Sequence, residues 1–385
     1  MTPKIAIIGA GPGGCMLARL LHHKTGLAAM KEAGLYEEFL KLARYDGESL
    51  IVCDKKQTTY MRRYPAKDRK KNCIQEAPEI DRVQLRKLLI ESVPEGVVQW
   101  GYRLLRVESD LSLHFDNRHV ERGFDLIIGA DGAWSKVRNF LFSEKPFYSG
   151  LGGYDFTIPN AEKTASKAYK FINRGSVFAY SDGKALSGAQ LGDGSINVRW
   201  FNLYDENWME TCGFDPTDLA SAKKALKEEV HDWSFDLVKL VDSAQVTVQT
   251  RNLYMLPIGF NWEHKRGVTL LGDASNLMTP FAGVGLNTAL YDAMLLSRAI
   301  VESIQSPDSL DSHIVEYEKE RWANAKGAQE LTYGAPTDMV PTPGAPRTSI
   351  EAWVLRFMKI EVSKWAYPLL DAGVYTFYFF YKMFV

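Results

Sequence analysis

A glycine-rich turn near the N-terminus constrains the fold more than any other feature of the chain. The apolar run Ile5–Ile8 leads into Gly9, Gly11 and Gly14, and a helical pattern follows directly. The first glycine permits a tight turn, the second lets the backbone approach a phosphate, and the third lets the helix pack closely on the strand. Free N–H groups at the start of the helix would point at that phosphate. The turn predicts an α/β fold with a nucleotide-binding domain, although close packing alone would also use such a turn.

A second glycine-rich loop lies far from the first, at residues 270–287. A strand is predicted to end at its start, and Asp273 then offers a carboxylate to the hydroxyl groups of a ligand. Pro280, Gly283 and Gly285 lead into a long apolar helix and present backbone N–H groups. We expect the two loops to converge in space and to hold opposite parts of one elongated nucleotide cofactor.

The segments between these loops are of two kinds. Residues 81–92 have the spacing of an amphipathic helix, and 124–138 contain a buried strand that ends in the turn Asp131-Gly132. Residues 151–260 contain alternating stretches that predict an antiparallel sheet. We therefore expect a discontinuous nucleotide-binding domain at 1–150 and 251–335, a substrate-binding sheet domain at 151–250, and a C-terminal helix at 348–385.

The C-terminal segment is unusually aromatic. After the proline-rich connector 337–347, the chain from Trp365 onward is apolar but interrupted by Pro368, Asp371 and Lys382, and it is too short for an uninterrupted membrane span. Packing of this helix on the body of the protein is the favoured interpretation, and contact with a membrane or a partner is the alternative.

Composition excludes several classes of function. The 46 basic and 47 acidic residues nearly balance and form no long basic run, so the chain has no footprint for nucleic acid. Four cysteines without CxxC spacing suggest neither a disulfide framework nor a metal site. Because no export signal precedes the first strand, we expect a cytoplasmic protein; its oligomeric state stays open.

Three motifs occur in the order and at the spacing typical of one enzyme family. They are GxGxxG at 9–14, Asp131-Gly132 with Arg138 downstream, and Gly272-Asp273 followed by Pro280, Gly283, Gly285 and Asn287. From Ile5 to Gly334 the chain resembles the flavoprotein aromatic hydroxylases, which are single-component FAD-dependent monooxygenases, and its pattern is closest to the tetracycline-inactivating flavin monooxygenases. The resemblance implies a Rossmann-like FAD-binding domain of the para-hydroxybenzoate hydroxylase type, interleaved with an antiparallel-sheet substrate domain.

The resemblance also implies the residues that bind the cofactor. Arg82 would contact the flavin side, the Leu104 backbone the adenine, and Asp273 the ribityl and pyrophosphate region. For Arg82 a solvated helix charge, and for Asp131 a simple turn, are the alternative interpretations. The full cofactor-binding set is Gly9, Gly11, Pro12, Gly13, Gly14, Arg82, Leu104, Asp131, Asp273, Pro280, Gly283, Gly285, Leu286 and Asn287.

The implied reaction needs no obligatory catalytic side chain and no metal. NAD(P)H would reduce FAD, O₂ would add at C4a of the flavin, and the hydroperoxide would hydroxylate an aromatic or polycyclic small molecule. The pocket is expected between the 151–260 sheet and the flavin, although each polar candidate could instead be a surface or core residue. The candidates are Tyr154, Phe178, Asn197, Arg199, Met278 and Phe281. A flavin oxidase, epoxidase or reductase of secondary metabolism is the alternative enzyme.

One expected element is absent from the sequence. In this family a second strand, ending in the acid that binds the adenosine ribose, follows the first helix, whereas here Leu21 is followed at once by His22 and a further helix. Glu32 lies near the expected spacing but within that helix, so it is not the ribose acid. We expect that the numbered chain skips a segment of about 30 residues between Leu21 and His22; a true deletion would favour a protein without FAD.

Overall fold

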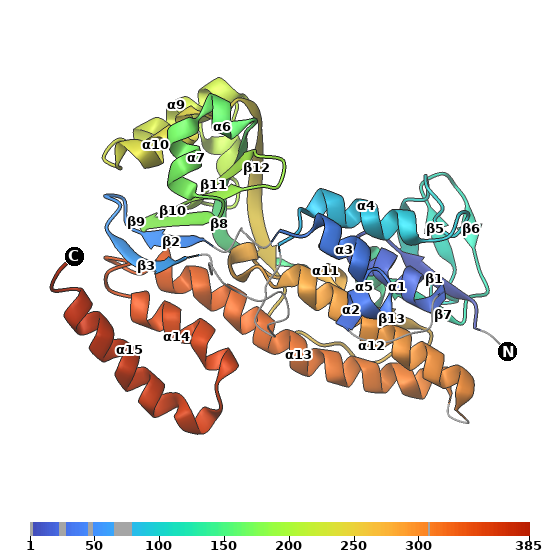
Figure 1. Ribbon diagram of the computed structural model, residues 1–385. Helices are drawn as coiled ribbons and strands as arrows, with labels where there is room; N and C mark the ends of the chain where they lie inside the picture. Colours follow the sequence, from blue (N-terminus) through green and yellow to red (C-terminus); the bar gives the residue numbers. More distant parts are fainter. Residues whose placement is uncertain (1–2, 23–27, 45–48, 65–78, 307–308) are drawn as a thin grey trace. The chain divides into compact units, whose positions relative to one another are not determined.

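The computed structural model describes residues 3–22, 28–44, 49–64, 79–306 and 309–385. The chain forms two compact units, each built from segments distant in sequence (Figure 1). The first comprises Met1–Leu42, Arg82–Phe147 and Tyr254–Tyr333, and the second Ala43–Asp81, Tyr148–Leu253 and Gly334–Val385. Parallel and antiparallel sheets with helices around them confirm the predicted mixed α/β class.

The first unit is built on a parallel sheet in the order β1 (Ile5–Ile8), β7 (Leu126–Gly129) and β13 (Val268–Leu270). Every residue of β7 and β13 is buried, as expected for apolar parallel strands covered on both faces. A small antiparallel sheet contains β4 (Leu104–Val107), β5 (Leu113–Phe115) and β6 (Val120–Glu121). The helices are α1 (Pro12–His22), α2 (Ala28–Glu32), α3 (Tyr36–Leu42), α4 (Arg82–Ser92), α5 (Lys136–Leu141), α11 (Asp273–Asn276), η1 (Pro280–Ala282), α12 (Gly285–Gln305) and most of α13 (Leu310–Met339).

The surroundings of β1 and α1 show where the segment that we expected to be missing would lie. α1 continues through Leu21 to His22, so the described helix runs across the point at which we expected the numbering to skip a segment, and that expectation stays a prediction. Residues 23–27 lie outside the described residues. All of β1 is only half-buried, and among the described strands none pairs with the edge of β1 that faces away from β7. In the described part of the chain, β1 is therefore an edge strand, and its backbone is unpaired on the side away from β7.

A groove of about 340 Å³ lies beside β1. Its apolar lining comes from β1, α1 and α12 and includes Ile5, Ile7, Ala18, Leu21, Ile300 and Ile304. Glu32, at the end of α2, forms an ion pair of 2.8 Å with Arg298 of α12. Its carboxylate is thus engaged by a neighbouring helix, as expected for a residue that is not the ribose acid.

The second unit is built on a seven-stranded sheet in the order β12 (Val246–Met255), β8 (Phe147–Ile158), β11 (Ile196–Leu203), β10 (Lys184–Gln190), β9 (Ser176–Ser181), β2 (Leu50–Cys53) and β3 (Thr59–Arg63). One face packs against helices α6 (Ala161–Thr164), α7 (Ser166–Ile172), α8 (Trp208–Thr211), α9 (Leu219–Glu229) and α10 (Phe235–Asp242). Tyr154, Phe156, Val198 and Trp200 form this core with apolar residues of the helices.

The boundaries of the two units differ from the predicted domain limits in residues 43–81. We assigned this segment to the nucleotide-binding domain, but β2 pairs in parallel with β9, and β3 pairs with β2. Four residues of β2, Leu50–Cys53, pair with Ser176–Ala179 of β9, so backbone pairing attaches the segment to the sheet of the second unit.

The C-terminal segment forms two helices where one was expected. α14 (Ile350–Glu361) ends in extended backbone at Val362, a short turn η2 (Lys364–Ala366) follows, and α15 (Tyr367–Tyr381) begins with Pro368 in its first turn. Proline is favoured at a helix start and disfavoured in a helix interior, so it explains the break. Among the described helices, none is both long enough and apolar enough to cross a membrane.

Candidate functional site

The two glycine-rich loops converge on one cleft in the first unit. The cleft has a volume of about 420 Å³ and is lined by residues of both loops, among them Gly11, Gly14, Asp273 and Gly285. The loops meet because α1 and α12 pack together: a Cβ at Gly13 would lie 3.4 Å from the Ala289 carbonyl oxygen. The helices α1 and α12 begin at this cleft, so the unpaired N–H groups of both first turns are available to a ligand.

The glycines of the first loop have different physical roles. A Cβ at Gly14 would lie 2.1 Å from the Gly9 carbonyl oxygen, and one at Gly9 would lie 2.3 Å from the Ala130 carbonyl oxygen. These two positions require glycine for packing. A Cβ at Gly11, in contrast, would meet nothing within 4 Å, although Gly11 lines the cleft. The open side of Gly11 leaves room for a ligand to approach the backbone.

The Arg138 side chain joins the Asp131-Gly132 turn to the second loop. It is 1% exposed, and its Nη1 donates to the Ala274 carbonyl oxygen at 3.0 Å, while Nη2 donates to that of Ala133. Burial lowers the pKa of Arg138, and this effect is opposed by the charges of Asp131 and Asp273. Arg138 therefore fixes the spacing of two turns at the cleft without lining it.

Asp273 lies at the cleft with Arg82 nearby. Its side chain is accessible from the open cleft, but protein atoms surround it on its other sides, and this burial raises its pKa against the opposing charges of Arg82 and Arg138. A ligand hydroxyl at this position would supply hydrogen bonds that the carboxylate does not receive from the described part of the chain.

The Gly272 turn before Asp273 is itself fixed by a buried ion pair. The Asp292 carboxylate accepts from the Gly272 N–H at 3.1 Å and from Arg321 Nε at 3.4 Å. Both side chains are fully buried, and burial raises the pKa of Asp292 against the charge of Arg321. The pair connects α12 and α13 to the turn that positions Asp273.

Ten of the fourteen predicted cofactor residues line the cleft. They are Gly11, Pro12, Gly13, Gly14, Arg82, Asp273, Pro280, Gly283, Gly285 and Leu286. Gly9 lies beneath the loop against Ala130, Leu104 is buried in the hydrophobic core, and Asn287 lies in the first turn of α12. The Asp131 carboxylate accepts from the Ser135 hydroxyl and the Lys136 N–H, so it caps α5, in line with the turn interpretation.

Several cleft residues were not predicted. The most informative is Arg86, one helical turn after Arg82 on α4, which places a second guanidinium at the cleft. The i, i+4 spacing of the two arginines was the signal in the sequence that could have identified it. The remaining unpredicted lining residues are Leu85, Ala130, Gly132, Leu271, Gly272, Thr279 and Ala289.

The predicted substrate residues do not share one surface. In the second unit, Tyr154 pairs with Trp200 and Asp155 with Arg199, so Tyr154 and Arg199 lie on opposite faces of the sheet. Tyr154 is 2% exposed and stacks on Phe156 in the core, and its assignment as a substrate residue is therefore wrong. Phe178, Asn197 and Arg199 lie on the other face.

The polar candidates on that face differ in their partners. Arg199 Nε donates to Asp155 at 3.0 Å, and the same carboxylate also binds Arg251, so the Arg199 charge is already paired. Asn197 Nδ2 donates to the Phe156 carbonyl oxygen at 3.3 Å, whereas its buried Oδ1 has no hydrogen-bond partner within the described part of the chain. In the first unit, Met278 lines the cleft and Phe281 lies in η1 beside it.

The donors at the cleft fit FAD. Two helix N-termini and two arginines suit the pyrophosphate and the electron-rich edge of a reduced flavin, and a carboxylate suits ribityl hydroxyls. The open space at Gly11, and at Gly283 with its φ of 68°, lets backbone approach a flat or anionic group closely.

Comparison with known proteins identifies the family. The family profile described as FAD binding domain matches residues 23–332, which is most of the chain. The chain therefore belongs to the FAD-binding domain family, and its class is that of the FAD-dependent monooxygenases, as the three glycine motifs predicted. Monooxygenase asqM of Emericella nidulans is 28% identical over 86% of this chain and 94% of that protein.

Solved structures share the fold at low sequence identity. A salicylate hydroxylase in complex with its substrate has a TM-score of 0.73 at 17% identity and covers 96% of this chain and 98% of its own. Tetracycline destructase Tet(51) has a TM-score of 0.60 at 19% identity, with 92% and 96% covered. The alignment with asqM spans 423 positions, more than the 385 residues of this chain, so that relative carries segments that this chain lacks.

Proposed function

We propose that the protein is a single-component monooxygenase that uses FAD, NAD(P)H and O₂ to hydroxylate an aromatic or polycyclic small molecule. The observation that carries this proposal is the convergence of the two glycine-rich loops on one cleft, with both helix N-termini, Arg82 and Asp273 at its surface. The asqM relative, a monooxygenase covered over 94% of its length, supports the oxygen-inserting reaction.

The bound flavin would supply electron transfer and the activation of oxygen. The protein would supply position and charge. The N–H groups at the start of α1 and the open backbone at Gly11 would bind the pyrophosphate, and Asp273 would accept hydrogen bonds from ribityl hydroxyls. The N–H groups at the start of α12 would stabilise negative charge on the reduced ring system.

Substrate contacts follow from the corrected set of candidates. Met278 and Phe281 offer apolar contacts beside the cofactor cleft, and Phe178 offers an aromatic surface in the second unit, where it stacks with Tyr180 at 6.5 Å. Asn197 offers the buried acceptor Oδ1 that has no partner in the described part of the chain. A substrate hydroxyl or N–H donor would satisfy this atom.

A labelling experiment tests the reaction. The protein is reconstituted with FAD and incubated with NADPH or NADH, ¹⁸O₂ and a panel of phenolic and polycyclic compounds, and product mass is measured. We expect one ¹⁸O atom in the product. Product formation without label would contradict hydroxylation and favour the oxidase or reductase alternative, and label in an epoxide would favour the epoxidase. An Asn197→Leu variant should raise KM for the true substrate more than it changes kcat.

A further inference from the structure

We propose that α15 lies in the surface of a phospholipid bilayer through an aromatic face made of Leu369, Tyr375, Phe377, Phe379 and Phe380. These five side chains are between 54% and 74% exposed. Large exposed apolar patches of this kind mark interaction sites on proteins. Trp365 before the helix is 80% exposed and Phe384 after it is 86% exposed, so the apolar surface extends beyond both ends.

The width of the aromatic face favours a bilayer over a protein partner. At about 100° per residue, these five residues span an arc of roughly 200° on the helix. A partner helix covers a narrower stripe, about 100° or less for a coiled-coil seam. A helix lying in a lipid interface is in contact with apolar material over such a broad arc.

The aromatic face itself carries no charged side chain, and the charges nearest to it lie at its C-terminal end. All of α15 is described. On the side of the helix that carries the aromatic face, which is the arc of roughly 200° bounded by Tyr375 and Phe377, it has no charged side chain. Asp371, away from the face, pairs with Lys359 at 2.6 Å, and at the C-terminal end of the face Lys382 donates to both oxygens of Glu351 at 2.7 Å. The five residues of the face are uncharged, and Lys382 at its end is paired with Glu351, so most of the affinity should come from apolar burial.

The protein holds the other side of α15 firmly. The Tyr378 hydroxyl donates to the Tyr60 carbonyl oxygen at 3.1 Å, and the Tyr381 hydroxyl donates to that of Thr59 at 2.6 Å. Both acceptors belong to β3, so the helix is anchored on the sheet edge of its own unit. The aromatic face points away from this anchor, because Tyr378 lies opposite Leu369 and Phe380 on the helix.

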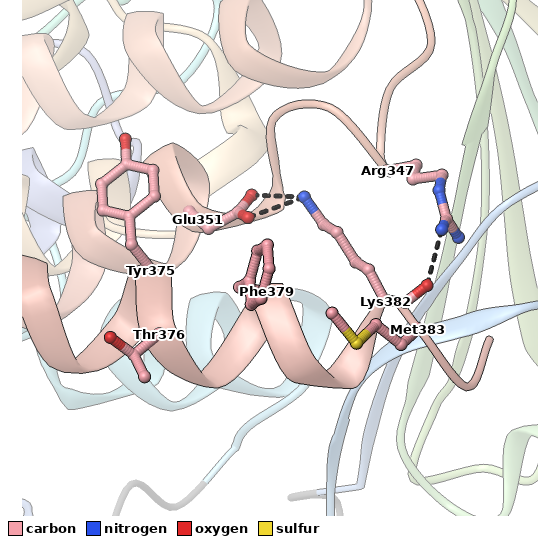
Figure 2. Close-up of a pocket in the computed structure, with 7 residues that line it drawn as sticks. All are labelled: Arg347, Glu351, Tyr375, Thr376, Phe379, Lys382 and Met383. Atoms are coloured by element: carbon pink, nitrogen blue, oxygen red, sulfur yellow. Dashed lines mark hydrogen bonds and ion pairs between the residues drawn. The ribbon is translucent and has the colours of Figure 1, made fainter.

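A groove at the C-terminal end of the face suits a single lipid molecule. It has a volume of about 640 Å³, and Figure 2 shows Phe379 and Met383 beside the ion pair of Lys382 and Glu351. Arg347 lies at the same end and donates to the Lys382 carbonyl oxygen at 2.6 Å. The polar end would receive a headgroup and the Phe379 side an acyl chain.

The length of the helix favours lying in the interface. α15 has 15 residues, about 22 Å at 1.5 Å per residue, which is shorter than the hydrocarbon core of about 30 Å. Tryptophan and tyrosine prefer the boundary between water and lipid, and Trp365 and Tyr375 are both exposed on this segment.

Sedimentation with vesicles tests the proposal. The full chain is mixed with phosphatidylcholine vesicles at about 0.15 M and about 0.5 M salt, and the bound fraction is measured. We expect similar binding at both salt concentrations, because the five residues of the face carry no charge. The double variant Phe379→Ser, Phe380→Ser should lower the partition coefficient at least ~10-fold. Phe235→Ser, which removes an equally exposed phenylalanine from α10, should change nothing.

Three results would overturn the proposal. These are no binding of the wild-type chain to phosphatidylcholine, binding only to phosphatidylserine vesicles with loss at high salt, and a dimer in size-exclusion chromatography that the double variant dissociates. Leu369→Gln, at a side chain 74% exposed, provides a second variant if the double variant loses its thermal transition. The FAD absorbance of each variant shows separately whether the cofactor cleft is intact.

Discussion

Gly11 and Gly14 lie in the same loop but have different roles, since Gly11 faces the cofactor cleft and Gly14 is needed for packing. Alanine at Gly14 would place its Cβ 2.1 Å from the Gly9 carbonyl oxygen, so the backbone must move. Overpacking of this kind costs about 3 kcal/mol, near the upper end of its usual range. The Gly14→Ala variant should therefore melt roughly 4 °C lower than the wild-type protein, with or without FAD.

Alanine at Gly11 should leave the stability of the protein nearly unchanged and should weaken FAD binding. Its Cβ would meet nothing within 4 Å, so the fold should tolerate it, and the apo protein should melt within about 1 °C of the wild type. In the complex the methyl group would occupy space next to the pyrophosphate. A steric cost of about 1–3 kcal/mol corresponds to roughly 5–150-fold weaker FAD binding.

Scanning calorimetry of the apo proteins and quenching of flavin fluorescence on titration measure the two quantities. We expect Gly14→Ala to lose stability and Gly11→Ala to lose FAD affinity, and this difference between the two variants separates packing from cofactor binding. Wild-type FAD affinity in Gly11→Ala would show that this glycine does not face the cofactor. A normal melting temperature in Gly14→Ala would show that the close approach to Gly9 is wrong.

Three other substitutions test charges in the first unit. Burial raises the folded-state pKa of Asp273 above its ordinary 3.8, so the ionised carboxylate opposes folding as the pH rises above that value; Asp273→Asn should raise the melting temperature of the apo protein at neutral pH and weaken FAD binding about tenfold. Burial acts to lower the pKa of His264, but the contact with Glu318 helps to raise this pKa above 6.5. The stabilisation by protonated His264 is therefore complete below pH 6.5 and is lost above the raised pKa. His264→Gln should lower the melting temperature more at about pH 5.5 than at about pH 9. Arg321→Met leaves Asp292 buried without a counter-charge and should cost about 3–5 kcal/mol in chemical denaturation, most of which the double variant with Asp292→Leu should recover; equal losses in the single and double variants would contradict the pairing.

Local constraints made much of the first unit predictable from sequence. The turns at Gly9, Gly14 and Gly272 require glycine because of close backbone approach or positive φ, and such requirements are visible in the residues themselves. The amphipathic helix at 81–92 and the buried strand at 126–129 follow from apolar spacing in the same way.

Long-range choices were not predictable from the same information. Which face of the second sheet Tyr154 occupies depends on pairing with Trp200, and a shift of one residue would reverse it. The addition of β2 to β9 depends on contacts across more than 120 residues, for which the sequence carries no local signal. The ion pair of Asp292 and Arg321 joins two helices, and each residue alone reads as an ordinary polar helix position.

The outer edge of β1 can be tested directly by hydrogen exchange. The Lys4 and Ile8 carbonyl oxygens accept from Asp125 and Ala130 beside β7, so Lys4, Ala6 and Ile8 direct their backbone groups toward β7. Because backbone groups alternate along a strand, the Ile5 and Ile7 N–H groups point to the other edge, which no described strand covers.

We expect the amides of Ile5 and Ile7 to exchange much faster than those of Ile127 and Ile128 in β7, which are fully buried between two strands. Exchange is measured by mass spectrometry of peptides from the native protein, with electron-transfer fragmentation to resolve single amides. The half-buried state of β1 supports the expectation, since a covered parallel strand would be buried as β7 is. Equal protection of the two strands would contradict the expectation. It would show that the outer edge of β1 is covered by residues outside the described part of the chain or by a second copy of the protein.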